Sequence, residues 1–263
     1  MRAQLPGLTM AYEASGSGRP LLLLHGYPLN RRIWQPQFDA LLDAAWIVAP
    51  DLRGHGETQA SEGAYSMEQL ADDAAALLEE LGISQPVVVG GLSMGGYAAL
   101  AFYRKYRHRV AGLVLASTRA GADSAEGRAG REKTAAAAHA NGAGAIADAM
   151  LPKMLAPRTY ETNPDLAHRV RAIMAGTSVA GIVGALLGMR DRPDSTPLLA
   201  EVDQPVLVIH GAQDQLIPPS EAEAMYAAMP NSRLELVPGA GHLVNMEQPA
   251  SFNAAVRTFL QSL

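Results

Sequence analysis

The chain has 263 residues, enough for one large domain or for one domain with an insertion. Its formal net charge of −5 argues against nucleic-acid binding, because a protein that binds the phosphate backbone normally needs a basic surface. There is no cysteine, which excludes disulfides, thiolate metal ligands and a cysteine nucleophile. No apolar run near the N-terminus is typical of a signal peptide or approaches the ~20 residues of a membrane span. We therefore expect a cytoplasmic protein without stable membrane insertion.

Strand-like and helical patterns alternate through the first 118 residues. The helix expected at Met67–Leu81 is the clearest element, because Ser66 can cap its first turn and Gly82 can end it. Around it we predict, in chain order, a hairpin of Ala3–Leu5 and Thr9–Ala14, strand Leu21–Leu24, helix Arg31–Ala45, strand Trp46–Ala49, strand Val87–Gly90, helix Met94–Tyr106 and strand Gly112–Ala116.

The segment from Arg119 to Thr196 breaks this alternation. It contains no convincing strand, and it is rich in alanine, glycine and helix-forming residues. We expect about four helices there, the first two separated at Asn141-Gly142. Apolar residues such as Met150 and Leu187 favour a packed helical insertion over a flexible linker, which is the alternative for a segment of this composition.

The alternation resumes after this insertion, with strand Val206–His210, a helix from Pro219, strand Leu234–Val237 and a final helix from about Gln248. Strands that alternate with helices are typical of a parallel sheet covered on both faces. We therefore predict an α/β fold with a mostly parallel eight-stranded sheet. Residues 1–118 and 197–263 would form its core, and residues 119–196 would be inserted after the sixth strand.

A serine between small residues joins the strand Val87–Gly90 to the next helix. Residues 91–95 read GLSMG, the pattern G-x-S-x-G. A nucleophilic serine needs a sharp strand-to-helix turn, which glycines two positions before and after it permit. The following helix also presents free N–H groups and its dipole to the hydroxyl. A phosphate-binding loop would need lysine where Tyr97 stands. The pattern therefore predicts that Ser93 is a nucleophile rather than a helix cap.

A serine nucleophile needs a general base, and His242 is the leading candidate among the seven histidines. It lies in a loop of small residues after the last predicted strand, from which an imidazole can reach the end of another strand. His25 and His55 are alternatives, although both are more typical of histidines that shape loops. No two histidines have the spacing H-x-x-x-H, so we expect no zinc site.

An acid must orient the base, and Asp214 follows the seventh predicted strand. Asp123 is the second candidate, because it follows the sixth strand and its loop also opens at the carboxyl edge of the sheet. Asp51 is the third, but we interpret its tight turn with Arg53 as structural. The order serine, aspartate, histidine along the chain is the order of hydrolase triads on α/β sheets.

Five short motifs carry a family resemblance: HGYP at 25–28, DLRGHG at 51–56, GLSMGG at 91–96, GAQD at 211–214 and GAGH at 239–242. With these motifs in this order, the chain resembles the α/β-hydrolase superfamily over essentially its whole length, and within it the serine esterases and enol-lactonases. The resemblance implies that Ser93 is the nucleophile, His242 the base and Asp214 the acid. It also implies an oxyanion hole formed by the backbone N–H groups of Tyr27 and Met94, and a helical cap in the insertion.

The activity implied is that of a serine hydrolase, which cleaves carboxylic esters through an acyl-enzyme intermediate without metal or organic cofactor. We expect Tyr27 and the cap residues Met150, Met154 and Leu187 to bind the substrate. Such an apolar lining favours small or medium uncharged esters. A monomer or a homodimer is expected, with a small ester or lactone as its partner.

Three alternatives remain open from the sequence. The first is a lactone hydrolase similar to 3-oxoadipate enol-lactonases, in which Lys153 or Arg190 would hold the substrate carboxylate. The second is a cofactor-free perhydrolase, in which peroxide intercepts the serine ester. The third is a receptor that binds a small ligand without turnover. Dehalogenases and epoxide hydrolases share the layout, but Ser93 stands where they carry aspartate.

Overall fold

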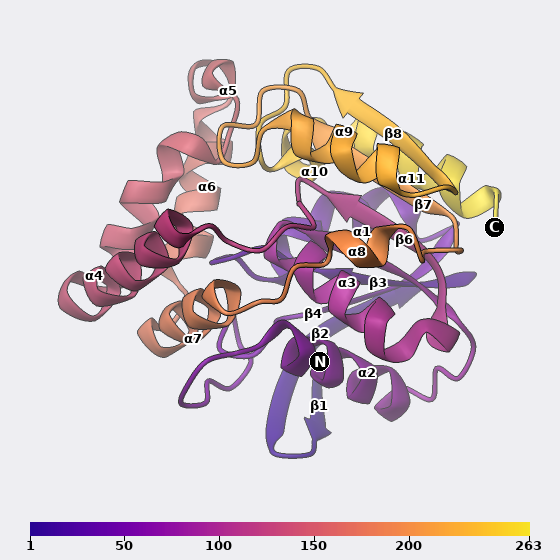
Figure 1. Ribbon diagram of the computed structural model, residues 1–263, viewed down its shortest axis with the longest axis horizontal. Coiled ribbons are helices and arrows are strands. Elements are labelled where there is room, and N and C mark those ends of the chain that lie inside the picture. Colours follow the sequence, from indigo (N-terminus) through magenta and orange to yellow (C-terminus); the bar gives the residue numbers. More distant parts are fainter.

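One sheet of eight strands organises the protein, whose computed structural model describes all 263 residues (Figure 1). The strands are β1 (Arg2–Leu5), β2 (Leu8–Gly16), β3 (Arg19–Leu24), β4 (Ala45–Pro50), β5 (Val87–Leu92), β6 (Val110–Ala116), β7 (Val206–Gly211) and β8 (Ser232–Val237). They stand in the order β1-β2-β4-β3-β5-β6-β7-β8. Only the pairs β1-β2 and β2-β4 are antiparallel. The predicted fold class and the predicted N-terminal hairpin are confirmed.

Helices cover both faces of this sheet because its central strands are apolar on both sides. In β3, Leu22 and Leu24 belong to one buried cluster, while Leu21 and Leu23 belong to the other. The first cluster packs against α2 (Met67–Glu80), α3 (Met94–Tyr106) and α9 (Pro219–Ala228). The second packs against α1 (Gln35–Leu41), α10 (Val244–Glu247) and α11 (Pro249–Gln261).

The single helix predicted over Arg31–Ala45 is wrong in its extent. A 3₁₀ turn, η1 (Arg31–Trp34), precedes α1, and Ala45 already belongs to β4. Pro36 stands in the first turn of α1. Proline lacks the N–H that would continue a helix from the preceding turn, so a new helix starts beside it.

Five helices lie between β6 and β7: α4 (Ala125–Met150), α5 (Pro157–Thr162), α6 (Pro164–Ala175), α7 (Val179–Arg190) and α8 (Thr196–Leu199). Figure 1 shows α4, α5, α6 and α7 gathered to one side of the sheet. The break expected at Asn141-Gly142 lies at Gly142, whose φ of 75° interrupts α4. The sequence did not predict α5. No helix is by itself long and apolar enough to cross a membrane; only α6 and α7 taken together meet that criterion, and they are bent by 90°.

Hydrogen bonds from α7 (Val179–Arg190) and from the segment before it fasten this helical group to the core. The Tyr65 N–H donates to the Gly184 carbonyl oxygen at 2.8 Å. The Thr177 hydroxyl donates to the carbonyl oxygen of Pro28 at 2.7 Å, in the loop that follows β3. The second bond ties the segment before α7 to the loop that carries Tyr27.

Candidate active site

Ser93 occupies a strained turn between β5 and α3. Its φ of 55° and ψ of −115° are rare for a residue with a side chain. The surrounding chain holds it there, because its N–H donates to the Ala116 carbonyl oxygen at 2.9 Å and its own carbonyl oxygen accepts from the Thr118 hydroxyl at 2.8 Å. The serine thus sits at the carboxyl end of a central strand and at the N-terminus of a helix.

The two glycines that flank this turn are required by close backbone contacts. A Cβ atom on Gly91 would lie 2.1 Å from the Gly95 carbonyl oxygen, and one on Gly95 would lie 2.1 Å from the Leu24 carbonyl oxygen. Any side chain at either position would therefore displace the backbone. This is the steric condition for which the pattern G-x-S-x-G was interpreted as a nucleophile turn.

His242 and Asp214 form a buried hydrogen-bonded pair. His242 follows β8 and Asp214 follows β7, and Nδ1 of the histidine lies 2.8 Å from Oδ2 of the aspartate. Since a carboxylate only accepts hydrogen bonds, Nδ1 carries the proton and donates it. In the neutral imidazole Nε2 is then left as the basic atom, which is the tautomer that a general base needs.

Asp214 is held by further donors. Its Oδ1 accepts from the N–H groups of Leu216 at 2.8 Å and Ile217 at 3.0 Å, and His210 Nε2 lies 3.2 Å from Oδ2. Burial by itself raises the pKa of Asp214, but the charge of His242 and these hydrogen bonds outweigh it and hold the pKa below its usual range. The carboxylate therefore stays ionised beside the imidazole.

Strand order brings the three residues of the predicted triad to one edge of the sheet. β5, β7 and β8 are parallel, with β6 between the first two, so the loops that carry Ser93, Asp214 and His242 all leave the sheet at its carboxyl edge. The structure joins Asp214 to His242 by a hydrogen bond and joins neither of them to Ser93 by one.

Two backbone N–H groups near Ser93 have no acceptor in the chain. Met94 is the first residue of α3, where helical N–H groups have no intrahelical partner. Tyr27 lies in the loop after β3, and its N–H takes part in none of the backbone hydrogen bonds of the loops and caps. A Cβ atom on Gly26, the preceding residue, would lie 3.3 Å from Ser93 Cβ, which places the Tyr27 loop against the serine.

Asp123, the alternative acid, lies among arginines rather than histidines. Arg119 Nη2 donates to it at 2.6 Å, Arg192 Nη1 at 2.8 Å and Arg131 Nε at 3.0 Å. Burial tends to raise its pKa, yet the bonds to Arg131 and Arg192 lower it overall. No histidine is hydrogen-bonded to Asp123, although its side chain is only 1% exposed.

The alternative bases His25 and His55 are buried in backbone hydrogen bonds. Nδ1 of His25 donates to the Gly26 carbonyl oxygen at 2.9 Å, and its Nε2 accepts from the Leu52 N–H at 2.9 Å. Nδ1 of His55 lies 2.9 Å from the Arg53 carbonyl oxygen. Desolvation lowers the pKa of His25 to about 4 and that of His55 to about 3. Both remain neutral above pH 5, as expected for histidines that shape loops.

Asp51 and Arg53, which were expected to share a structural turn, are each paired with a residue far away in the chain. Asp51 forms an ion pair with Arg31, and Arg53 pairs with Asp73 on α2 at 2.6 Å. Both interactions span 20 residues. Local sequence patterns carry no information on such pairing, which depends on where a distant helix lies.

The cap residues predicted to bind substrate differ in their burial. Met154 is fully buried, and its carbonyl oxygen accepts a hydrogen bond of 3.2 Å from the N–H of Leu243, next to His242. Met150 is half-buried and packs against both core clusters, while Leu187 is half-buried and belongs to neither. Their contact with a substrate stays a prediction. Tyr27 is 6% exposed, and its hydroxyl has no hydrogen-bond partner.

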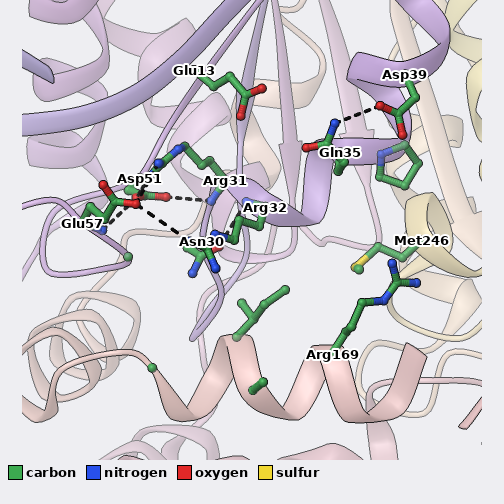
Figure 2. Close-up of a pocket in the computed structure, with 15 residues that line it drawn as sticks. Glu13, Asn30, Arg31, Arg32, Gln35, Asp39, Asp51, Glu57, Arg169 and Met246 are labelled. Carbon is green, nitrogen blue, oxygen red and sulfur yellow. Dashed lines mark hydrogen bonds and ion pairs between the residues drawn. The ribbon is translucent and has the colours of Figure 1, made fainter. Parts of the chain in front are cut away.

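A cavity of about 660 Å³ lies between α6 and the core, away from the predicted triad (Figure 2). Figure 2 shows Arg169 of α6 facing Asn30, Arg31 and Arg32, which follow the Tyr27 loop. None of the predicted site residues Ser93, Asp214, His242, Tyr27 and Met94 lines it. No group of three or more His, Cys, Asp or Glu side chains in the protein could hold a metal ion.

Two contacts of the site were missed in the sequence. His210 contacts Asp214, and the spacing of four residues between them is a signal that could have pointed to it. Glu247 accepts a hydrogen bond of 2.8 Å from the N–H of Gly241, which precedes His242. No pattern along the chain predicts that second contact.

The model of the α/β hydrolase fold family matches residues 19–249. This chain belongs to that family. It is similar to a thermophilic esterase from Thermogutta terrifontis, solved with malate bound, at 42% identity over 100% of this chain and 98% of that one, with a TM-score of 0.97. A 3-oxoadipate enol-lactonase from Acinetobacter baylyi is 29% identical over 99% of this chain and 96% of its own. A Bacillus subtilis relative, provisionally named a 2-succinyl-6-hydroxy-2,4-cyclohexadiene-1-carboxylate synthase, is 30% identical over 97% of this chain and 94% of its own.

These likenesses confirm the predicted esterase and enol-lactonase-like branch of the family. They support a hydrolase that acts on a small molecule. The esterase is the most similar of the three in sequence, and its match covers this chain from end to end.

Proposed function

We propose that this protein is a serine hydrolase that cleaves carboxylic esters of small or medium, mostly uncharged substrates. The observation that carries the proposal is the buried bond between His242 and Asp214 at the edge of the sheet where Ser93 occupies its strained turn. The 42% identity to an esterase over the whole chain supports the same substrate class. Residues 119–196 are proposed to act as the cap of this site.

The mechanism follows from the roles proposed for these groups. His242 Nε2 takes the proton of the Ser93 hydroxyl while Oγ attacks the ester carbonyl carbon. The N–H groups of Tyr27 and Met94 donate to the oxyanion of the tetrahedral intermediate, and loss of one such donor typically costs about 10²–10³ in kcat. The imidazolium donates its proton to the alkoxide oxygen of the leaving group as the C–O bond breaks. The alcohol departs, and the acyl group remains bound to Ser93 as an acyl-enzyme.

Water completes the cycle. His242 removes a proton from a water molecule, the hydroxide attacks the acyl carbon, and the acid leaves as the serine regains its proton. Asp214 stays ionised throughout and stabilises the imidazolium that forms twice. No step needs a metal or an organic cofactor.

A lactone hydrolase is the second candidate, which the likeness to a 3-oxoadipate enol-lactonase favours. The chemistry would be the same on a cyclic ester. Of the two cations considered for a substrate carboxylate, Arg190 is engaged by Asp191 at 2.7 Å and by Glu132 at 3.0 Å, so its charge is already matched. Lys153 is exposed and forms no ion pair, which leaves it as the better candidate of the two.

A panel of chromogenic esters with graded acyl length, together with lactones and with peroxide as alternative acceptor, tests the proposal. We expect turnover of short and medium uncharged esters by the wild type and background rates by Ser93→Ala. A strong preference for an anionic lactone would move the assignment to the second candidate. Binding of ligands without any turnover would contradict both.

The same panel tests the cap. Met150→Trp and Leu187→Trp should each change the preferred acyl length, with KM shifts of about tenfold, because filling a pocket by a few methylene volumes has effects of that size. Ala136→Trp, at an exposed position of α4, is the matched control. An unchanged profile in both variants would exclude these two residues from the pocket.

A further inference from the structure

The carboxylate of Glu247, the last residue of α10, lies between two segments of the chain. Its Oε1 accepts a hydrogen bond of 2.8 Å from the N–H of Gly241, the residue before His242. Its Oε2 accepts from the Ala156 N–H at 2.7 Å and from the Thr159 hydroxyl at 2.7 Å. One carboxylate therefore joins the loop of the proposed base to the start of α5.

Direct backbone contacts reinforce this junction. The N–H of Leu243, the residue after His242, donates to the Met154 carbonyl oxygen at 3.2 Å. A Cβ atom on Gly241 would lie 2.4 Å from the Ala156 nitrogen, so the two backbones touch at a position where only glycine fits. The residues on both sides of His242 thus rest on segment 154–159 of the insertion.

The chemistry of the junction requires a carboxylate. Three donors converge on Glu247, and an ionised carboxylate only accepts, whereas the amide of glutamine would turn an NH₂ group toward at least one of them. No lysine or arginine pairs with Glu247. Burial raises its pKa, as does the charge of Asp214, against the three hydrogen bonds that lower it. A buried carboxylate without a cationic partner is unfavourable unless hydrogen bonds replace the hydration that it loses.

We propose that Glu247 is a positioning residue of the active site, which sets the orientation of His242 through Gly241 and couples it to segment 154–159. The inference rests on the proposed function, in which His242 is the base. A movement of that segment on substrate binding would then reach the His242 loop through the hydrogen bonds of Glu247, through the Leu243–Met154 hydrogen bond and through the backbone contact of Gly241 with Ala156. The substrate's fit in the cap would affect kcat as well as KM.

The charge of Glu247 gives this role a specific signature. The titratable groups that interact with Glu247 are Asp214 after β7 and Tyr160 in α5. His242 follows Gly241, whose N–H donates to the Glu247 carboxylate. Glu247→Gln removes a negative charge next to the loop of the proposed base, whose protonated form is a cation. The acidic limb of the kcat/KM profile should therefore move to lower pH in Glu247→Gln.

Three variants test the inference: Glu247→Gln, Thr159→Val, and Glu235→Gln as a control at an exposed position of β8. Glu247→Gln should lower kcat on a short-chain ester by about 10- to 100-fold with little change in KM, because small misplacements of a catalytic group have effects of that size. Thr159→Val removes only one donor and should lower kcat severalfold. Circular dichroism verifies folding, and Thr159→Val carries the test if Glu247→Gln does not fold.

Imidazole ¹⁵N resonances of His242 provide a readout that does not need turnover. They should shift in Glu247→Gln and Thr159→Val and stay constant in Glu235→Gln. Wild-type rates, an unmoved pH profile and unmoved resonances in both junction variants would overturn the inference. If the wild type cleaves no ester while the resonances respond as expected, the proposed function fails and the positioning role stands.

Discussion

Two buried aspartates lie at the same edge of the sheet, Asp123 after β6 and Asp214 after β7, and their partners differ. Asp123 is bonded to three guanidinium groups, which stay charged at every accessible pH. Asp214 is hydrogen-bonded to the His242 imidazole and to two backbone N–H groups, and His210 Nε2 lies 3.2 Å from it. Both carboxylates have lowered pKa values. Only the second contacts histidines, the residue type that serves most often as a general base.

The comparison separates a structural carboxylate from a candidate catalytic one. Asp123 links the loop after β6 to Arg131 on α4 and to Arg192 after α7, so it fastens the insertion to the core. Arg192 also lies over the Tyr97 ring of α3 at 4.1 Å. Burial and position at the carboxyl edge, the two criteria available for both aspartates, therefore do not distinguish the roles. The hydrogen-bond partners do.

The largest effect that we expect is on kcat, and it distinguishes Asp214 from Asp123. Asp214→Asn should lower kcat on a short-chain ester by about 10⁴, because the amide no longer fixes the His242 tautomer. Asp123→Asn should stay within about tenfold of the wild type, since it contacts no reacting group. Steady-state rates of both folded variants measure the difference. Should Asp123→Asn be the more damaging change, the proposed roles of the two loops would be reversed.

The next largest effect is the loss of stability that we expect when Asp123 is replaced. Asp123→Asn leaves Arg192, whose side chain is 3% exposed, without its counter-charge. Removal of one partner of a buried ion pair lowers the free energy of unfolding by about 3–5 kcal/mol. Asp43→Asn, which breaks the exposed pair with Arg257, should lower it far less, because solvent screens an exposed ion pair. Urea unfolding measures the free energy of unfolding of both variants. Equal losses would show that the buried arginine cluster stabilises the fold no more than an exposed ion pair does.

Histidines without a carboxylate partner give a smaller, pH-dependent effect. His25 and His55 have native pKa values of about 4 and about 3, whereas an unfolded histidine titrates near 6.5. Between these values the unfolded chain binds more protons, so the free energy of unfolding falls as the pH falls from about 6.5 to 4. Each histidine contributes up to about 1.4 kcal/mol per pH unit in that window.

His55→Phe isolates this contribution, with the exposed His139→Phe as control. Urea unfolding at pH 7 and pH 5 should show a weaker loss on acidification for His55→Phe than for the wild type. The control should lose as much as the wild type. Identical pH dependence in all three proteins would mean that His55 is not neutral in the native state.

The parts of the fold that the sequence predicts are those set by local sterics and periodicity. The turn at Ser93 follows from the local contact of Gly91, where a Cβ atom would lie 2.1 Å from the Gly95 carbonyl oxygen. The helix at Met67–Glu80 follows from its cap, where the Ser66 hydroxyl accepts from the Gln69 N–H at 3.0 Å. Such features depend on residues close together in the chain, so one sequence suffices to predict them.

The parts that escaped prediction depend on distant partners. Arg53 pairs with Asp73 and Glu247 with Ala156, and nothing near either residue in the chain indicates its partner. The aspartates after β6 and β7 have equivalent positions in the sequence pattern. Only the histidines and arginines that surround them in three dimensions distinguish their roles. For the same reason the triad could be proposed from motifs, while the contact of Glu247 with the His242 loop could not.

Fluorophosphonate labelling with site mapping tests the central claim, that the pair His242–Asp214 activates Ser93. We expect one label per chain, on the peptide that contains Ser93, and none in Ser93→Ala. The labelling rate should fall by orders of magnitude in Asp214→Asn and remain near the wild-type rate in Asp123→Asn. A label on another serine, or a rate that responds to Asp123 and not to Asp214, would contradict the account.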